Sequence, residues 1–254
     1  MELLQIKQVS REFGGLKAIQ DVSFPVRQGS IHGVIGPNGS GKTTLFNVIS
    51  GYYKPTQGEV WFENKPIHAL SPFQVNRAGL ARTFQNLRLF KKMTVLENVC
   101  AVLDRESGIR IWDYVVAPKR VFRIEKETIR KAEALLEVFD LLEWRDFLAE
   151  NLPYGVQKRL EIARALATHP KLLLLDEPAA GLNHTETDEL ARIIRYIRDE
   201  RGITVLVIEH DMKLMMTICE TITVMNEGMV LTEGTPNQVS KNKQVITAYL
   251  GGEW

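Results

Sequence analysis

The sequence predicts an α/β fold built on a mostly parallel sheet, and three observations point to it. Strand-like apolar runs alternate with helix-like segments along the last third of the chain, as in a parallel sheet flanked by helices. The glycine-rich motif GPNGSGKTT follows the strand-like run IHGVI directly. A second apolar run, KLLLLD, ends in acidic residues. Both motifs therefore stand at the ends of predicted strands, where ligands bind in folds of this class.

Composition and charge are those of an ordinary globular domain. The chain has 254 residues, of which 44% are hydrophobic and 25% charged, and its net charge is +1. This near-neutral balance indicates no strong attraction to nucleic acid or to a membrane surface. Cys100 and Cys219 lack metal-ligand spacing, so we expect two reduced thiols. We see no signal peptide, and the apolar runs have strand length, so we expect any membrane crossing to fall to another chain.

The expected elements form three blocks. β-Branched and aromatic runs broken by Gly, Asn and Pro predict strands in the first third, over residues 3–10, 19–26, 30–36 and 58–67. The middle block is helical, and its clearest helix covers residues 125–142, with apolar side chains at helical spacing. The last third alternates between strand and helix patterns, through residues 171–176, 185–201, 203–210, 212–220 and 221–228. We expect a single domain over residues 1–254, with an α/β core at about 1–84 and 169–254 and an inserted helical subdomain at about 85–168.

The first motif matches the phosphate-binding loop pattern G-x-x-x-x-G-K-[ST]. Its glycines let backbone N–H groups point inward at phosphate oxygens, and a helix beginning near Lys42 adds its dipole at the same point. Lys42 is expected to reach the β- and γ-phosphates, and the Thr43 hydroxyl to bind magnesium. The candidate phosphate-binding residues are Gly36, Pro37, Asn38, Gly39, Ser40, Gly41, Lys42, Thr43 and Thr44.

Four polar residues are expected beside this loop. Asp176 and Glu177 end a predicted buried strand, so we expect Asp176 to hold the magnesium and Glu177 to orient or deprotonate an attacking water. His210 also follows an apolar strand, which favours a contact to the γ-phosphate. Gln85 lies where the core gives way to the helical block, and its amide can bind magnesium or water. The alternative for Gln85 is a solvated loop residue.

Together these residues resemble the ATP-binding subunits of ABC transporters over nearly the whole chain. GPNGSGKT is similar to the Walker A loop, LLLLDE to the Walker B strand with its catalytic glutamate, and Gln85 to the Q-loop. AGLN at 180–183 is similar to the D-loop, and His210 to the switch histidine. Phe13 occupies the place of the aromatic residue that stacks on adenine, although aromatic residues more often pack in a core. The resemblance implies ATP and Mg²⁺ as cofactors, ATP hydrolysis, and an N-terminal antiparallel β part.

Several stretches resemble, more narrowly, the ATPase subunits of branched-chain amino acid importers. These are FGGLKAI, RTFQNLRLF, MTVLENV, YGVQKRLEIARAL, DEPAAGLN, EHDMKLMM and AYLG. The resemblance implies membrane-spanning permease subunits as partners, a solute-binding protein indirectly, a peripheral place at the cytoplasmic face of the membrane, and no nucleic acid. It also implies a head-to-tail dimer, either a homodimer or a heterodimer with a second ATPase. No residue of an ATPase subunit is known to read the transported solute, so the solute follows from the resemblance alone.

The segment LPYGV departs from the family's Leu-Ser-Gly-Gly-Gln signature. Pro153 stands in the place of the serine and offers neither a hydroxyl nor a backbone N–H. A helix that starts here can still direct its dipole and its first N–H groups at phosphate. We therefore expect Tyr154, Gly155 and Val156 to contact ATP across the dimer, and we expect that dimer to be weakened.

Other functions and one segment stay open. Another ABC system, such as lipid extraction, or a soluble ABC ATPase acting on DNA or ribosomes would share these motifs. A phosphate-loop kinase or GTPase would not explain the YGVQKRLEIARAL helix. Residues 105–126 mix apolar and basic side chains. Packing on the helical subdomain is the favoured interpretation there, and docking or a headgroup contact is the alternative.

Overall fold

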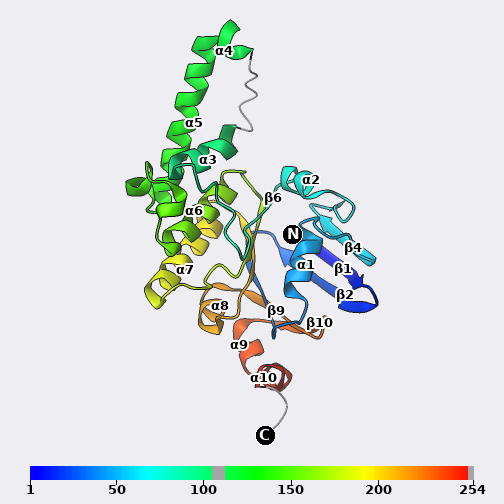
Figure 1. The fold of residues 1–254 in the computed structure, drawn as a ribbon. Helices are drawn as coiled ribbons and strands as arrows, with labels where there is room; N and C mark the ends of the chain where they lie inside the picture. The colour runs from blue at the N-terminus through cyan, green and yellow to red at the C-terminus, as the bar shows by residue number, and fades with distance from the viewer. Residues whose placement is uncertain (105–111, 251–254) are drawn as a thin grey trace. The chain divides into compact units, whose positions relative to one another are not determined.

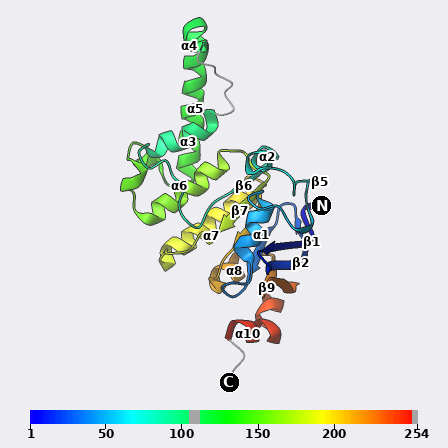
Figure 2. The same ribbon diagram turned by 45° about the vertical axis from the view of Figure 1, so that its right-hand side comes forward.

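A computed structural model of the chain describes residues 1–104 and 112–250, without the side chains of 114, 115 and 250. The chain divides into two compact units, which we call the core unit (residues 1–85 and 171–254) and the helical unit (residues 86–170). Figures 1 and 2 show the elements of both units. The sequence analysis expected the division at about residues 84–85 and 168–169.

The described part of the core unit contains two sheets. The larger has the strand order β10-β9-β3-β8-β7-β6, in which β10 alone runs antiparallel to its neighbour. The smaller, with the order β2-β1-β4-β5, is antiparallel. The predicted class, a mostly parallel sheet with an N-terminal antiparallel part, is confirmed. The strands are β1 (Glu2–Phe13), β2 (Leu16–Arg27), β3 (Ile31–Ile35), β4 (Gln57–Phe62), β5 (Lys65–Pro66), β6 (Leu80–Arg82), β7 (Leu172–Asp176), β8 (Thr204–Ile208), β9 (Thr221–Asn226) and β10 (Met229–Gly234).

The run predicted as one strand over residues 58–67 is a hairpin of two strands. Glu63 and Asn64 have φ values of 49° and 60°, and they join β4 to β5. Two consecutive residues with positive φ form the tight turn that matches the twist of paired strands. The sequence prediction missed this reversal because Asn64 is followed by lysine and not by the glycine that usually marks such a turn.

The helices of the core unit pack on the parallel sheet. Every residue of β3, β7 and β8 is buried, as expected for central parallel strands covered on both faces. The apolar side chains of α1 join one hydrophobic cluster with residues of both sheets, and α7 contacts β8 and α8. The helices are α1 (Lys42–Ile49), α2 (Pro72–Arg77), α7 (His184–Asp199), α8 (Met212–Ile218), α9 (Pro236–Ser240) and α10 (Lys243–Leu250).

In the helical unit, α3, α4 and α6 each contact the long helix α5 (Figure 2). The predicted helix over 125–142 is found as α5, but α5 begins earlier and ends at Val138. Phe139 caps it, and Asp140 leaves the helical conformation with a φ of 51°. The elements are α3 (Val95–Leu103), α4 (Asp113–Val116), α5 (Pro118–Val138), α6 (Tyr154–Leu166) and the 3₁₀ turns η2 (Leu142–Trp144) and η3 (Ala149–Asn151).

The apolar cluster expected within residues 105–126 is only partly described. Ile109, Ile111, Arg105 and Arg110 lie outside the described residues, as do the side chains of Tyr114 and Val115. Trp112 and Val116 are 73% and 80% exposed, so these two side chains are not packed in the helical unit. Within the described residues, no helix is both long enough and apolar enough to cross a bilayer.

Candidate active site

The phosphate loop joins the end of β3 to α1, as the sequence predicts. Gly36 has a φ of 156°, and a Cβ atom there would lie 2.1 Å from the carbonyl oxygen of Met225 on β9. Gly41 has a φ of 95°, and its Cβ would lie 2.6 Å from the carbonyl oxygen of Ala18. Neighbouring backbone therefore admits only glycine at both positions. The Gly228 N–H, from the turn between β9 and β10, donates to the Ser40 carbonyl, which fixes the loop against this turn.

Lys42 is the first residue of α1, and its side chain folds back over the loop. Its Nζ donates to the carbonyl oxygens of Gly36 at 2.7 Å and Pro37 at 2.9 Å. Burial lowers the pKa of Lys42, and the negative charges of Glu177 and Asp176 oppose this effect. The ammonium is thus placed inside the loop and close to the two acids, where it can balance the charge of a phosphate.

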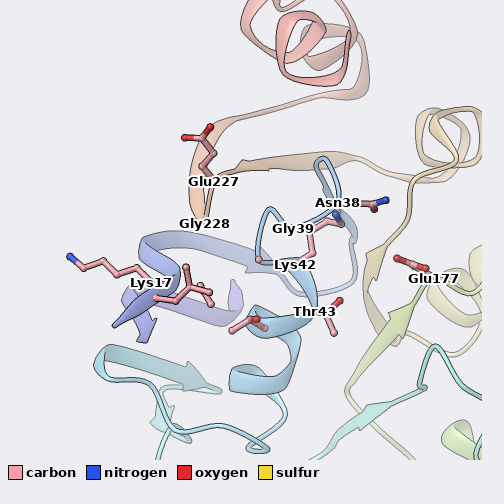
Figure 3. A pocket seen from close by; sticks show the side chains of 12 residues that line it. Lys17, Asn38, Gly39, Lys42, Thr43, Glu177, Glu227 and Gly228 are labelled. Atoms are coloured by element: carbon pink, nitrogen blue, oxygen red, sulfur yellow. The ribbon is translucent and has the colours of Figure 1, made fainter. Parts of the chain in front are cut away.

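A cavity of about 470 Å³ opens beside this loop (Figure 3). In this view Lys17 and Glu177 lie on opposite sides of the loop, with Lys42 and Thr43 between them. The lining also includes side chains from the start of β2 and from the β9–β10 turn, which the sequence analysis did not anticipate. The lining residues are Leu16, Lys17, Ala18, Asn38, Gly39, Gly41, Lys42, Thr43, Thr44, Glu177, Glu227 and Gly228.

Asp176 ends β7 and forms a buried ion pair with Arg82 at the end of β6. The distance from Arg82 Nη2 to Asp176 Oδ2 is 2.8 Å, and the two side chains are 6% and 3% exposed. Arg82 Nη1 also donates to Asn47 Oδ1 and Ser50 Oγ, both at 2.8 Å. The sequence analysis missed Arg82. Its position three residues before Gln85, at the end of a short strand paired with β7, is the signal that could have identified it.

Glu177 follows Asp176 with a φ of 47°, which is a strained conformation for a residue with a side chain. Its N–H donates to the Ile208 carbonyl at 2.9 Å, and its Oε2 accepts a hydrogen bond from Gln85 Nε2 at 2.8 Å. The structure therefore brings Gln85 and Glu177 together. The left-handed backbone at Glu177 turns the chain sharply at the end of β7, and Glu177 lines the cavity.

His210 follows β8 at the same edge of the sheet, and its side chain is 64% exposed. The residue before it, Glu209, is completely buried and accepts hydrogen bonds from backbone N–H groups. Burial raises the pKa of Glu209, and these N–H groups oppose the increase. Sequence analysis missed Glu209, although an acid at the end of an apolar strand was a visible signal. His210 is not among the residues that line the cavity.

Phe13 is placed at the end of β1, outside the cavity lining. Its ring packs edge-on against Tyr53 at 5.2 Å, and the Arg11 guanidinium lies 4.6 Å from its centre. Phe13 is 37% exposed. Leu16, the residue paired with Phe13 across the strand turn, does line the cavity. Adenine stacking on Phe13 stays a prediction.

The segment LPYGV, which differs from the family signature, lies at the start of α6 in the helical unit. Pro153 is the N-cap residue, with φ −54° and ψ 149°, and the helix has no side-chain cap. Pro153 is thus one position earlier than the first helical residue, where proline is most favoured. Gln157 N–H makes the first helical bond, to the Pro153 carbonyl. Val156 is only 6% exposed, so its side chain is not available to a ligand.

Comparison with known proteins agrees with this geometry. The ABC transporter family matches residues 19–180, which include the phosphate loop, Asp176 and Glu177. The chain belongs to the ATP-binding subunits of ABC transporters. A second family, described as the branched-chain amino acid ATP-binding cassette transporter, matches residues 229–254. As a member of the ABC family, the protein is an ATPase that binds nucleotide.

Curated relatives of this ABC subunit match it along almost its full length. It is 43% identical over 249 residues to the high-affinity branched-chain amino acid transport ATP-binding protein BraF of Pseudomonas aeruginosa, and the match covers 98% of each chain. The same identity and coverage hold for LivG of Escherichia coli, which carries the same description. A probable branched-chain amino acid transport ATP-binding protein of Archaeoglobus fulgidus is 39% identical over 254 residues, covering 100% of this chain and 97% of the relative.

Solved ABC cassettes share the fold. The ADP conformation of one ATP-binding cassette has a TM-score of 0.86 and 35% identity, covering 99% of both chains. A dimeric cassette in a post-hydrolysis state, bound to ADP and Pi, has a TM-score of 0.77 and 26% identity, covering 92% of this ABC subunit and 99% of the solved chain. The α/β class and the nucleotide-binding function are therefore confirmed.

Proposed function

We propose that this ABC subunit hydrolyses ATP to energise an importer of branched-chain amino acids. The geometric observation that carries the ATPase site is one cavity lined by both Lys42 and Glu177 at the carboxyl edge of the parallel sheet. The solute class is supported by the names of relatives that share 43% identity along nearly the full chain. Those names favour amino acid import over lipid extraction and over a role on DNA or ribosomes.

The residues beside the loop divide the work on ATP. Backbone N–H groups of residues 38–44 and the Lys42 ammonium bind the β- and γ-phosphates. Glu177 orients the attacking water and accepts its proton, and His210 contacts the γ-phosphate. The hydrogen bond from Gln85 to Glu177 occupies one carboxylate oxygen, so we infer that Gln85 turns away before Glu177 can act as a base.

The site offers magnesium a small number of protein ligands. Among the described residues no group of three or more His, Cys, Asp or Glu could hold a metal ion, which suits a cation held mainly by phosphates. Thr43 is exposed at the start of α1, and the Asp176 ion pair engages Oδ2 and leaves Oδ1 available. Thr43, Asp176 and Gln85 would hold Mg²⁺, which when bound neutralises charge on the phosphate oxygens.

We infer that the working unit is a dimer with membrane-spanning partners. The sequence contains one phosphate-loop motif, and the described residues place one helix start, that of α6, at the signature position. Each ATP would then lie between the loop of one subunit and Tyr154, Gly155 and Val156 of another. The second subunit is another copy or a related ATPase. Permease subunits would hold the dimer at the cytoplasmic face of the membrane, and a solute-binding protein would act through them.

Transport in proteoliposomes tests this function. The subunit is co-purified with the permease subunits, reconstituted with the solute-binding protein, and supplied with ATP and radiolabelled leucine. Uptake should require ATP and should be lost with Glu177→Gln, which keeps the shape of the side chain and removes the base. ATP hydrolysis that responds to another solute class, with no uptake of leucine, isoleucine or valine, would disprove the proposed solute.

A further inference from the structure

Glu209 is a buried acid that the proposed site does not use. It directly follows the last residue of β8, and its exposed fraction is 0%. An ionised carboxylate in such a place is costly unless hydrogen bonds compensate it. The hydrogen-bond partners of Glu209 therefore indicate why this position carries an acid and not an apolar residue.

The carboxylate of Glu209 connects two loops that carry proposed catalytic residues. Glu209 Oε1 accepts a hydrogen bond from the Ala179 N–H at 2.6 Å, in the loop that begins with Glu177. Glu209 Oε2 accepts one from the His210 N–H at 3.0 Å. The Asp211 N–H lies 3.5 Å from the same oxygen, and the His210 ring nitrogen Nδ1 lies 3.7 Å from it. Each oxygen of one carboxylate thus serves one loop.

The backbone after β7 shows what the hydrogen bonds of Glu209 stabilise. The loop after β7 starts from the strained conformation of Glu177, whose φ is 47°. Strain of this kind persists only where surrounding contacts fix the backbone. The hydrogen bond from the Glu177 N–H to the Ile208 carbonyl fixes the start of the loop, and the bond from the Ala179 N–H to Glu209 fixes it two residues later. Ile208 therefore fixes the loop at Glu177, and Glu209 fixes it at Ala179.

We propose that Glu209 is a positioning residue that sets the spacing between the Glu177 loop and the His210 loop, so that both side chains act on one γ-phosphate. The proposal rests on the assignment of Glu177 and His210 made above. Glu209 itself touches neither ATP nor water in this mechanism. Its effect passes through the backbone at Ala179 and His210.

The test compares variants by turnover, nucleotide affinity and thermal stability. Glu209→Gln keeps the volume but offers one acceptor oxygen in place of two, so one loop loses its bond. We expect kcat to fall at least about tenfold while KM and Kd for ATP stay within about twofold, since the phosphate loop is unchanged. Glu209→Asp keeps the charge but is shorter, so it should lower kcat in the same way.

Thr223→Val is the matched control, because Thr223 is also fully buried and hydrogen-bonded but contacts His32 away from the cavity. It should lower the melting temperature and leave kcat within about twofold. Glu209→Gln combined with His210→Ala should be non-additive in kcat, because the single changes disable the same unit.

Three results would overturn the positioning role. The first is a normal kcat in Glu209→Gln. The second is an equal loss of kcat in Thr223→Val and Glu209→Gln when the two variants have the same melting temperature. The third is unfolding of both Glu209 variants. If Glu177→Gln and His210→Ala also keep normal turnover, the catalytic assignment fails as well. If those two lose turnover while Glu209→Gln does not, the positioning proposal alone fails.

Discussion

Lys42 shows how a single side chain can be prepared for a charged ligand. Its ammonium is held by two carbonyl oxygens of its own loop and lies near the charges of Glu177 and Asp176. These contacts keep a cation in place in a largely buried position. A phosphate group would exchange two neutral acceptors for charged ones, which form stronger hydrogen bonds with an ammonium.

We expect Lys42→Ala to keep the fold and to lower ATP hydrolysis by about 100-fold or more, because one full positive charge at the γ-phosphate is lost. Steady-state phosphate release measures the effect, and circular dichroism checks the fold. Lys171→Ala is the control, since Lys171 is an exposed lysine paired with Glu63 and lies outside the cavity lining. A folded Lys42→Ala with normal turnover would refute the site.

At the scale of an element, the start of α6 keeps one feature that attracts phosphate and lacks another. Pro153 supplies an N-cap backbone without a capping side chain. The helix dipole and the first N–H groups remain, but a hydroxyl does not. The consequence is a helix end that can attract phosphate and that lacks one hydrogen-bond donor.

Changing the N-cap residue should therefore affect dimerisation more than stability. We expect Pro153→Ser to add a capping hydroxyl at the start of α6 and to tighten the ATP-bound dimer, while the loss of the rigid proline offsets most of the gain in stability. Gly155→Asp should weaken that dimer, because it places bulk and negative charge against phosphate. Light scattering of the Glu177→Gln background with ATP measures dimerisation. If Gly155→Asp dimerises like its parent, α6 does not face ATP.

Strand β3 carries a histidine whose burial makes the fold sensitive to acid. His32 bonds to Thr223, and burial lowers its pKa from 6.5 to about 4. The folded state prefers neutral His32, so this stability is complete above pH 6.5 and is lost as the pH falls toward about 4. The shift corresponds to roughly 3 kcal/mol.

Urea unfolding of the wild type and His32→Gln at pH values from about 7 to about 4 tests this. The variant should lose less unfolding free energy than the wild type over that range, whatever its stability at neutral pH. Parallel pH profiles for the two proteins would show that His32 does not cause the acid sensitivity.

For the whole molecule, we expect the rate of ATP hydrolysis to depend on the association of two subunits. The chain has a phosphate loop and an α6 start that are proposed to act in different subunits. We expect ATPase activity per chain to rise with protein concentration, because association completes the site. Activity measured over a dilution series checks this. A rate per chain that stays constant on dilution would indicate a self-contained site.

Much of this molecule could be predicted from the sequence because its fold depends on local patterns. The phosphate loop, the buried strands ending at Asp176 and Ile208, and the mostly parallel sheet follow from residue order. The contacts of Arg82 and of Glu209 could not be predicted, since they join residues about 94 and 30 positions apart. The β4–β5 hairpin was missed because the turn at Glu63 and Asn64 lacks glycine.

The buried pair of Arg82 and Asp176 has a consequence for genetics. Asp176→Asn would leave the Arg82 cation buried without its counter-ion, and breaking such a pair costs about 3–5 kcal/mol. Loss-of-function alleles at position 176 should therefore reduce the amount of folded protein in the cell. A second substitution at position 82, to an apolar residue such as methionine, should offset this loss because it removes the stranded charge. In such a strain an immunoblot would show that the protein has returned to its normal abundance, while ATP hydrolysis would still be absent.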